Sequence, residues 1–146
     1  MQMLLTTLIL WLSANFGLPA TADHPHIIYE SPAKITALRY GGIPEHTFAN
    51  AQSSHRQVIS IYNPATKTIY LPKEWAGQTP AELSVLVHEL VHHLQEIQKQ
   101  KFSCPQEREQ LAYEAQDRWL RMFGSDLSKE FEIDPFTIIV LSTCMY

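Results

Sequence analysis

The sequence lacks basic runs, internal repeats and low-complexity stretches. No run of Lys or Arg exceeds two residues, and the formal net charge is -4. Nucleic acid is therefore not an expected partner, because no stretch of the chain offers a surface that could follow phosphates. No Ser/His/Asp order and no glycine loop of the phosphate-binding kind stands out. The chain has 146 residues, 45% hydrophobic and 18% charged, which is typical of one globular domain.

Charge is also absent from the N-terminal segment, Met1–Ala22. Its core, Leu4–Leu12, is nearly all apolar, and Ala20-Thr21-Ala22 is a small-x-small site of the kind that signal peptidase accepts. We predict a signal peptide over residues 1–22, a single domain over residues 23–146, and an exported, periplasmic or extracellular protein. The alternative is an uncleaved anchor, but the apolar run is short for a membrane span and Pro19 follows it. No stable membrane insertion is expected after cleavage.

Export determines how the two cysteines are interpreted. Cys104 and Cys144 both lie after the predicted cleavage site, and an even number of cysteines in an oxidising compartment favours a disulfide. The bond would close a loop of about 40 residues, which is worth roughly 3 to 4 kcal/mol in the chain-entropy model. Two buried free thiols are the alternative.

Turn and cap signals divide the rest of the chain into short elements. A helix begins at Ser31-Pro32 and ends at Gly41-Gly42, and a loop is expected over residues 43–55. Two β-branched runs on either side of Asn63-Pro64-Ala65 predict a hairpin. These strands and the later helices are predicted over residues 57–62, 66–71, 105–123 and 136–143, although Thr137–Leu141 would also suit a buried strand.

The strongest helix signal follows the hairpin. Thr79 is the expected N-cap, Pro80 the first helical residue, and Glu82 the acidic partner of a capping box. Apolar residues at helical spacing extend the helix to about Gln98. They are Leu83, Leu86, Val87, Leu90, Val91 and Leu94.

This helix carries an HExxH motif, His88-Glu89-Leu90-Val91-His92. Residues four apart lie on the same side of a helix, so the two imidazoles can bind one metal ion from a single rigid element. Neutral imidazole suits zinc, which lowers the pKa of a bound water to about 7. Glu89 can reach such a water as a general base. The alternative is a buried helix that carries these residues by chance, but a charged glutamate in an apolar run is costly unless it is paired or near a metal.

The run Val85–Leu94 resembles the active-site signature of zincin metallopeptidases. The resemblance implies a small sheet beside the helix, with an edge strand that holds an extended substrate, and Thr66–Leu71 would be that strand. The glycine and third histidine that mark metzincins do not follow His92. The gluzincin pattern instead implies a glutamate on a following helix as the third ligand.

Three glutamates on the following helix are candidates for this ligand: Glu107, Glu109 and Glu114. Glu109 is preferred and Glu114 comes second, because several small zincins show a similar glutamate with alanine three residues later, as Ala112 is here. Glu109, Ala112 and Gln116 also share one helix face. The stretch Glu109–Gln116, followed by Trp119-Leu120, resembles a group of short exported bacterial zincin-like proteins of undefined activity when it is taken with the motif helix and both cysteines. This resemblance covers roughly residues 66–144.

Some other residues have competing roles. His93 should point about 100° away from His92, so a role behind the ligands or at the surface is expected. Tyr113 would pack or donate to an oxyanion. Trp75 would shape the cleft or pack. His24 and His26 would form at most an adventitious metal site.

The sequence thus predicts an α+β fold of minimal zincin type, with a small sheet packed on the HExxH helix and on a glutamate-bearing helix. His88, His92 and Glu109 would hold one Zn²⁺ per chain, and Glu89 would be catalytic. The expected function is that of a secreted zinc hydrolase, most simply a metallopeptidase with a peptide or protein substrate. The alternatives are a non-catalytic zinc-binding module on the same scaffold and a metal-free structural helix.

Overall fold

The computed structural model describes residues 1–39 and 60–145, and it confirms the predicted α+β class. Predictions for residues 40–59, which include the end of the first helix, the loop over residues 43–55 and the start of the first hairpin strand, lie outside the described residues. The helices are α1 (Gln2–Phe16), α2 (Pro32–Arg39), α3 (Pro80–Ile97), α4 (Arg108–Arg121), α5 (Leu127–Phe131) and α6 (Pro135–Ser142). The strands are β1 (His26–Glu30), β2 (Ile61–Asn63) and β3 (Thr68–Pro72).

The sheet has the order β1-β3-β2. β2 and β3 pair antiparallel, with Tyr62 opposite Ile69, which confirms the predicted hairpin. β1 pairs parallel to β3 on its other side, and no periodicity in the sequence predicted this strand. The expectation that Thr66–Leu71 is a substrate-binding edge strand is wrong, because β3 is the central strand of the sheet, between β1 and β2.

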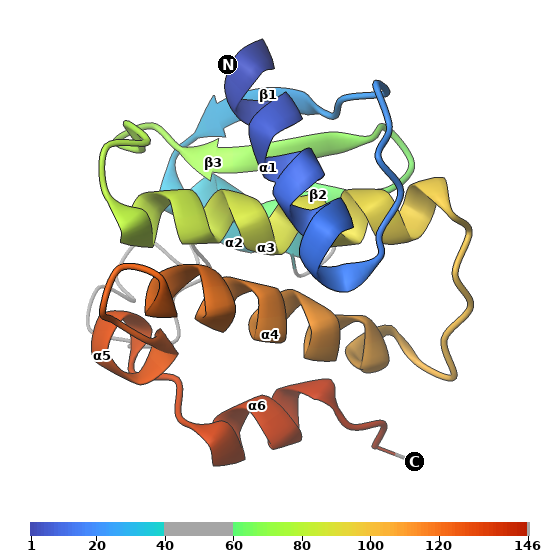
Figure 1. The fold of residues 1–146 in the computed structure, drawn as a ribbon. Helices are drawn as coiled ribbons and strands as arrows, with labels where there is room; N and C mark the ends of the chain where they lie inside the picture. Colours follow the sequence, from blue (N-terminus) through green and yellow to red (C-terminus); the bar gives the residue numbers. More distant parts are fainter. Residues whose placement is uncertain (40–59, 146) are drawn as a thin grey trace.

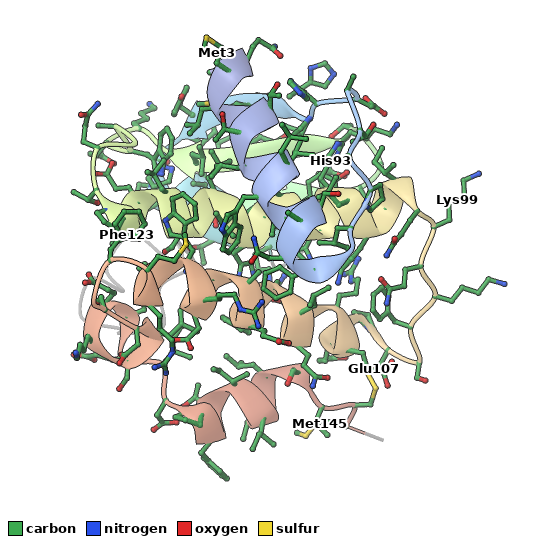
Figure 2. All side chains as sticks on the ribbon, viewed as in Figure 1. Met3, His93, Lys99, Glu107, Phe123 and Met145 are labelled. Carbon is green, nitrogen blue, oxygen red and sulfur yellow. A yellow bond between two sulfur atoms is a disulfide. The ribbon has the colours of Figure 1, made fainter. Side chains whose placement is uncertain are left out.

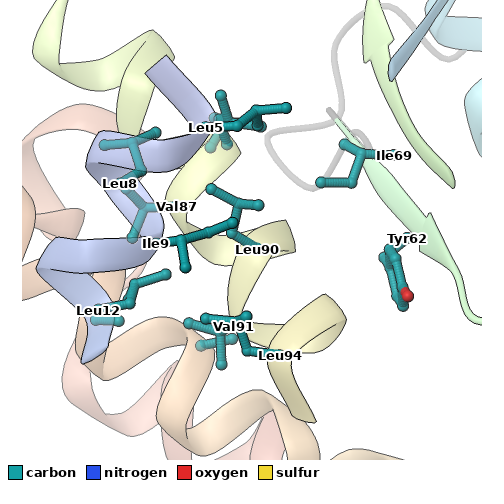
Figure 3. Packing of buried hydrophobic residues seen from close by; sticks show 14 of the residues in the cluster. Leu5, Leu8, Ile9, Leu12, Tyr62, Ile69, Val87, Leu90, Val91 and Leu94 are labelled. Atoms are coloured by element: carbon teal, nitrogen blue, oxygen red, sulfur yellow. The ribbon is translucent and has the colours of Figure 1, made fainter. Parts of the chain in front are cut away.

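The motif helix α3 lies at the centre of the molecule. In Figure 1 the sheet, α3, α4 and α6 follow one another as layers, and α1 crosses the sheet and α3. α3 is buried on almost every side, so apolar residues fill both its sheet-facing and its helix-facing surfaces. Figure 3 shows Val87, Leu90, Val91 and Leu94 of α3 meeting Ile69 from the sheet and leucines from α1.

The charge-free N-terminal segment forms α1 and packs into this core. Leu5, Leu8, Ile9 and Leu12 lie against α3 and are all buried. The described residues, 1–39 and 60–145, include no helix whose length and apolar character would let it cross a membrane. Cleavage after Ala22 remains a prediction.

The predicted N-caps are present where α3 and α6 begin, but the described hydrogen bonds do not close the capping box between Glu82 and the Thr79 backbone N–H. The Thr79 side chain accepts a hydrogen bond from the backbone N–H of Glu82, and Glu82 in turn accepts from Ala76 and Gly77. Asp134 caps α6 through the N–H of Thr137, which decides between the helix and strand readings of that segment. A 3₁₀ turn, Pro105–Glu107, precedes α4 within the predicted third helix. α5 was not predicted.

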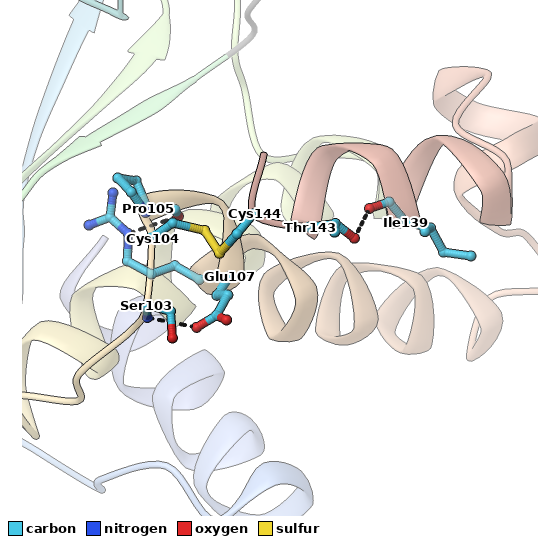
Figure 4. Close-up of a disulfide and its surroundings, with 8 residues drawn as sticks. Ser103, Cys104, Pro105, Glu107, Ile139, Thr143 and Cys144 are labelled. Atoms are coloured by element: carbon cyan, nitrogen blue, oxygen red, sulfur yellow. Dashed lines mark hydrogen bonds between the residues drawn. A yellow bond between two sulfur atoms is a disulfide. The ribbon is translucent and has the colours of Figure 1, made fainter. Parts of the chain in front are cut away.

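The predicted disulfide joins Cys104 and Cys144. It ties the residue before the 3₁₀ turn to the residues just after α6 (Figure 4). α6 lies on α4 at the far side of the molecule from the sheet, and none of its residues is fully buried. The disulfide is therefore the covalent attachment of an otherwise superficial helix.

Candidate metal centre

The site forms where α3 and α4 pack together. His88 and His92 lie one turn apart on α3, as their spacing predicts, and Glu109 lies in the first turn of α4. Ala112 and Ala115 are fully buried between the helices, and their small side chains allow close approach of the two backbones. This close approach brings a carboxylate from α4 up to the two imidazoles of α3.

Glu109 bridges both histidines. Its Oε2 lies 2.9 Å from His88 Nε2, and its Oε1 lies 3.2 Å from His92 Nε2. One ligand atom from each of the three residues lies within 4.8 Å of the others. The side chains of His88, His92 and Glu109 are 11%, 9% and 13% exposed, so the cluster is mostly buried but retains access to solvent. Among the described residues, no other group of three His, Cys, Asp or Glu side chains is placed this way.

Burial and charge act against each other in this cluster. Burial disfavours charged His88, but the hydrogen bond to Glu109 and the negative charges of Glu109 and Glu89 outweigh it, so the His88 pKa is raised. Burial likewise opposes ionisation of Glu109, but its hydrogen bonds to His88 and His92 lower its pKa well below the usual range. The carboxylate is therefore charged at neutral pH, and its preferred partner is a cation.

Two glutamines lie behind the histidines. Gln116 on α4 is hydrogen-bonded through its Oε1 to His88 Nδ1 at 2.9 Å, and its amide nitrogen donates to Ser84. Gln95 on α3 lies with its Oε1 3.1 Å from His92 Nδ1, and its amide nitrogen donates to the backbone carbonyl of Arg108. Each imidazole thus has Glu109 on one side and an amide on the other.

The glutamate of the motif is held apart from this cluster. Glu89 is buried, and its Oε1 accepts a hydrogen bond of 2.8 Å from Ser60, the residue before β2. Within residues 1–39 and 60–145 its other carboxylate oxygen has no hydrogen-bond partner, so this oxygen is available to a water or a substrate. The sheet therefore helps to orient the predicted general base.

Tyr113 lies at the same helix–helix junction. Its ring meets that of His88 edge-on, with the centroids 4.6 Å apart. Burial, Glu109 and Glu89 raise the Tyr113 pKa far above the usual range, and the positive charge of Arg39 opposes this only in part. The phenol thus stays a neutral hydrogen-bond donor at physiological pH, which is compatible with either predicted role.

The other candidate residues lie elsewhere or have structural partners. Glu107 accepts a hydrogen bond from the backbone of Ser103, and Glu114 is exposed, so neither joins the cluster.

His93 is fully buried rather than at the surface, between Tyr62 and the carbonyl of Asp23. His24 is hydrogen-bonded to Gln2 and Thr6. Trp75 packs at the start of α3 and donates to the Glu82 carbonyl. His26 lies at the start of β1.

Sequence reasoning missed the supporting residues Ser60, Gln95 and Tyr62. Gln116 was placed on the same helix face as Glu109, but its contact with His88 was not foreseen. Ser60 and Tyr62 carry no sequence signal of a site, because their roles depend on how the sheet packs on α3. Gln95 carries a weak one, since it follows His92 by three residues and thus shares its side of the helix.

The donor set fits a zinc ion. Two imidazole nitrogens and one carboxylate oxygen are a ligand set found in catalytic zinc sites, which keep a further position for water or substrate. A soft-metal thiolate set is excluded here, since both cysteines are joined in the disulfide.

The fold and the site together define an α+β protein with a His-His-Glu cluster shared by two packed helices. The chain belongs to the family described as a domain of unknown function, DUF6647, which matches residues 1–146. No curated protein and no solved structure matches the chain.

Proposed function

We propose that this protein is an exported zinc-dependent hydrolase of the zincin type, most simply a metallopeptidase. The observation that supports it best is the convergence of His88, His92 and Glu109, with their ligand atoms within 4.8 Å. The convergence matters because the two histidines of α3 and the glutamate of α4 together form the three-ligand set that the gluzincin arrangement requires.

Each residue of the site has a chemical role in this proposal. A zinc ion, when bound, supplies a Lewis acid that polarises a carbonyl and makes water a better nucleophile at neutral pH. His88, His92 and Glu109 hold the ion. Glu89, oriented by Ser60, accepts the proton of the attacking water and later gives it to the leaving group.

Space for a substrate lies beside His92. An open cavity of about 340 Å³ borders this ligand, and residues of the α3–α4 connection form much of its wall. Phe102 gives it an apolar surface, and Arg108 gives it a positive charge. Because β3 is the central strand of the sheet, we propose that a substrate binds in this cavity and not along that strand.

Metal content of the purified protein tests the proposal. We expect one zinc per chain in the wild type, loss of zinc in Glu109→Ala, and retention in Glu114→Ala, a matched change at an exposed glutamate of the same helix. Peptide-library cleavage by the zinc-loaded protein then tests hydrolysis. A wild-type chain that takes up no zinc would disprove the proposal, and zinc without any cleavage would favour the binding-module alternative.

A further inference from the structure

We infer that Gln116 and Gln95 are positioning residues that fix His88 and His92 in one tautomer, with the proton on Nδ1, so that both bind metal through Nε2. The inference rests on the proposed metal centre and deepens it. It follows from the direction of the hydrogen bonds, which can be assigned because each chain of bonds ends on a backbone carbonyl, a group that only accepts.

The chain behind His88 ends at Ala81. The Ser84 hydroxyl donates to the Ala81 carbonyl at 2.7 Å, so its oxygen is free to accept from the Gln116 amide nitrogen at 3.3 Å. That assignment turns Gln116 Oε1 toward His88 Nδ1. An amide oxygen cannot donate, so His88 Nδ1 must carry the proton.

The chain behind His92 is shorter. The backbone carbonyl of Arg108 can only accept, so Gln95 directs its NH₂ group toward it. Gln95 Oε1 then faces His92 Nδ1, which must donate. The Nε2 proton, which faces Glu109, is therefore the one that each ring loses when it becomes neutral, and the lone pair for a metal is then on Nε2.

His93 shows that the helix itself does not impose a tautomer with the proton on Nδ1. Its Nε2 lies 2.6 Å from the Asp23 carbonyl and must therefore donate, and its Nδ1 accepts from the Tyr62 hydroxyl. The adjacent histidine thus has the opposite tautomer. The tautomers of His88 and His92 are therefore set by their own partners.

Both glutamines are suited to this role by burial. Gln116 is 5% exposed and Gln95 is 2% exposed, so water cannot readily replace their amide oxygens if they are removed. Partners behind metal-binding histidines orient the ring, and their loss typically weakens metal affinity about 10- to 100-fold.

The test measures zinc affinity by competition with a chelator, which requires no substrate. Gln116→Met and Gln95→Met keep the side-chain length but remove the acceptor, and each should weaken zinc binding about 10- to 100-fold. Gln116→Glu restores an acceptor at the same place and should restore zinc affinity. Gln110→Met, the same change at an exposed position of α4, should leave zinc affinity unchanged.

A second measurement is independent of any variant. Two-bond ¹H–¹⁵N NMR spectra of the zinc-loaded wild type should show Nδ1 protonated in His88 and His92, and Nε2 protonated in His93. Zinc on Nδ1 of either ligand, or zinc affinities of both Met variants equal to that of the wild type, would overturn the inference while leaving the metal centre intact. Failure of the wild type to bind zinc would instead overturn the proposed function.

Discussion

Glu89 differs from the other charged residues of the site in having a neutral partner. The Ser60 hydroxyl donates to one carboxylate oxygen of Glu89. Glu89 is not part of the cluster that Glu109 forms with the two histidines. In Glu89→Gln the ligands are intact, so zinc content should stay at the wild-type level. Cleavage of a peptide substrate should fall about 100- to 10,000-fold, the usual contribution of a general base.

Zinc content and cleavage rate, measured on the same Glu89→Gln sample, check this prediction. Wild-type activity in the variant would remove Glu89 from the mechanism, and loss of zinc would make it a ligand instead. The matched change Glu114→Gln, at an exposed glutamate, should alter neither quantity.

The charges of His88 and Glu109 also predict how the stabilisation of the protein by zinc varies with pH. In the metal-free chain the raised His88 pKa gives stability that is complete below 6.5 and is lost as the pH rises through the raised value. The lowered Glu109 pKa gives stability that is present above 4.5 and is lost as the pH falls through the lowered value. Both contributions are therefore present together between pH 4.5 and pH 6.5, where the pair stabilises the metal-free chain most.

Zinc must displace the Nε2 proton of charged His88, so its affinity should fall as the pH decreases below the raised His88 pKa. The rise in Tm on adding zinc should consequently be larger at pH 8 than at pH 5.5. Thermal unfolding with zinc and with chelator at both pH values measures this difference. An increase in Tm that is the same at both pH values would show that protons and zinc do not compete.

At this scale helical periodicity predicted that the two histidines of the motif share one side of a helix. The choice of Glu109 on the following helix came instead from the resemblance to gluzincins. Gln95 and Ser60 could not be predicted in their roles. Gln95 depends on the carbonyl of Arg108 lying opposite it, and Ser60 depends on how the sheet packs on α3.

Among the elements, α6 depends most on one covalent link. No residue of α6 is fully buried, and Phe136 and Ile139 are 72% and 60% exposed. The disulfide from Cys104 to Cys144 fixes the end of this helix to the start of the 3₁₀ turn before α4. Replacing both cysteines by serine should lower the free energy of unfolding by about 3 to 4 kcal/mol.

Urea unfolding measures this change, and amide hydrogen exchange should show faster opening of α6 than of α4 in the serine variant. Zinc content should not change, since the ligands lie on α3 and α4. Protection of α6 equal to that in the wild type would show that its contacts with α4 are sufficient without the disulfide.

Local signals predicted the later helices better than the sheet. α3 and α6 begin with side-chain caps, at Thr79 and Asp134, and such caps can be read from neighbouring residues. β1 is different, because it pairs in parallel with β3, about 40 residues away in the chain. Such pairing leaves no turn signal beside the strand, so neither β1 nor the central position of β3 could be predicted.

For the whole molecule, the packing of α1 on α3 makes the N-terminal segment part of the apolar core. Leu8 is fully buried against α3, whereas Leu10 of the same helix is 55% exposed. In a chain that carries residues 1–22, Leu8→Ala should lower the free energy of unfolding by about 2 to 5 kcal/mol. Leu10→Ala, the matched control, should change it by less than about 0.5 kcal/mol.

Chemical denaturation of the two variants tests the packing, and the mass of the exported protein tests the predicted cleavage after Ala22. Equal effects of Leu8→Ala and Leu10→Ala in the full-length chain would show that α1 does not occupy this place. An exported chain that begins at Asp23 would confirm the signal peptide.

The apolar core of residues 4–12 was recognised in the sequence, but the sequence interpretation placed it outside the domain. A short apolar segment has the same composition whether it enters a membrane, is removed, or packs on a neighbour, so composition alone cannot choose between these fates. Figure 2 shows the side chains around α1. His93 of the motif helix lies beside the connection between α1 and β1, where its Nε2 is bonded to the Asp23 carbonyl.

The burial of α3 also limits how this scaffold can be altered. Residues 84–91 and 93–95 of the helix are buried, so nearly every position near the ligands has a packing or hydrogen-bonding partner. Directed evolution toward a new specificity would gain little from randomising the motif helix, because most replacements there would cost stability before they changed selectivity. Libraries are better placed in the connection around Gln100, Phe102 and Ser103, which lines the cavity beside His92 and carries little of the core.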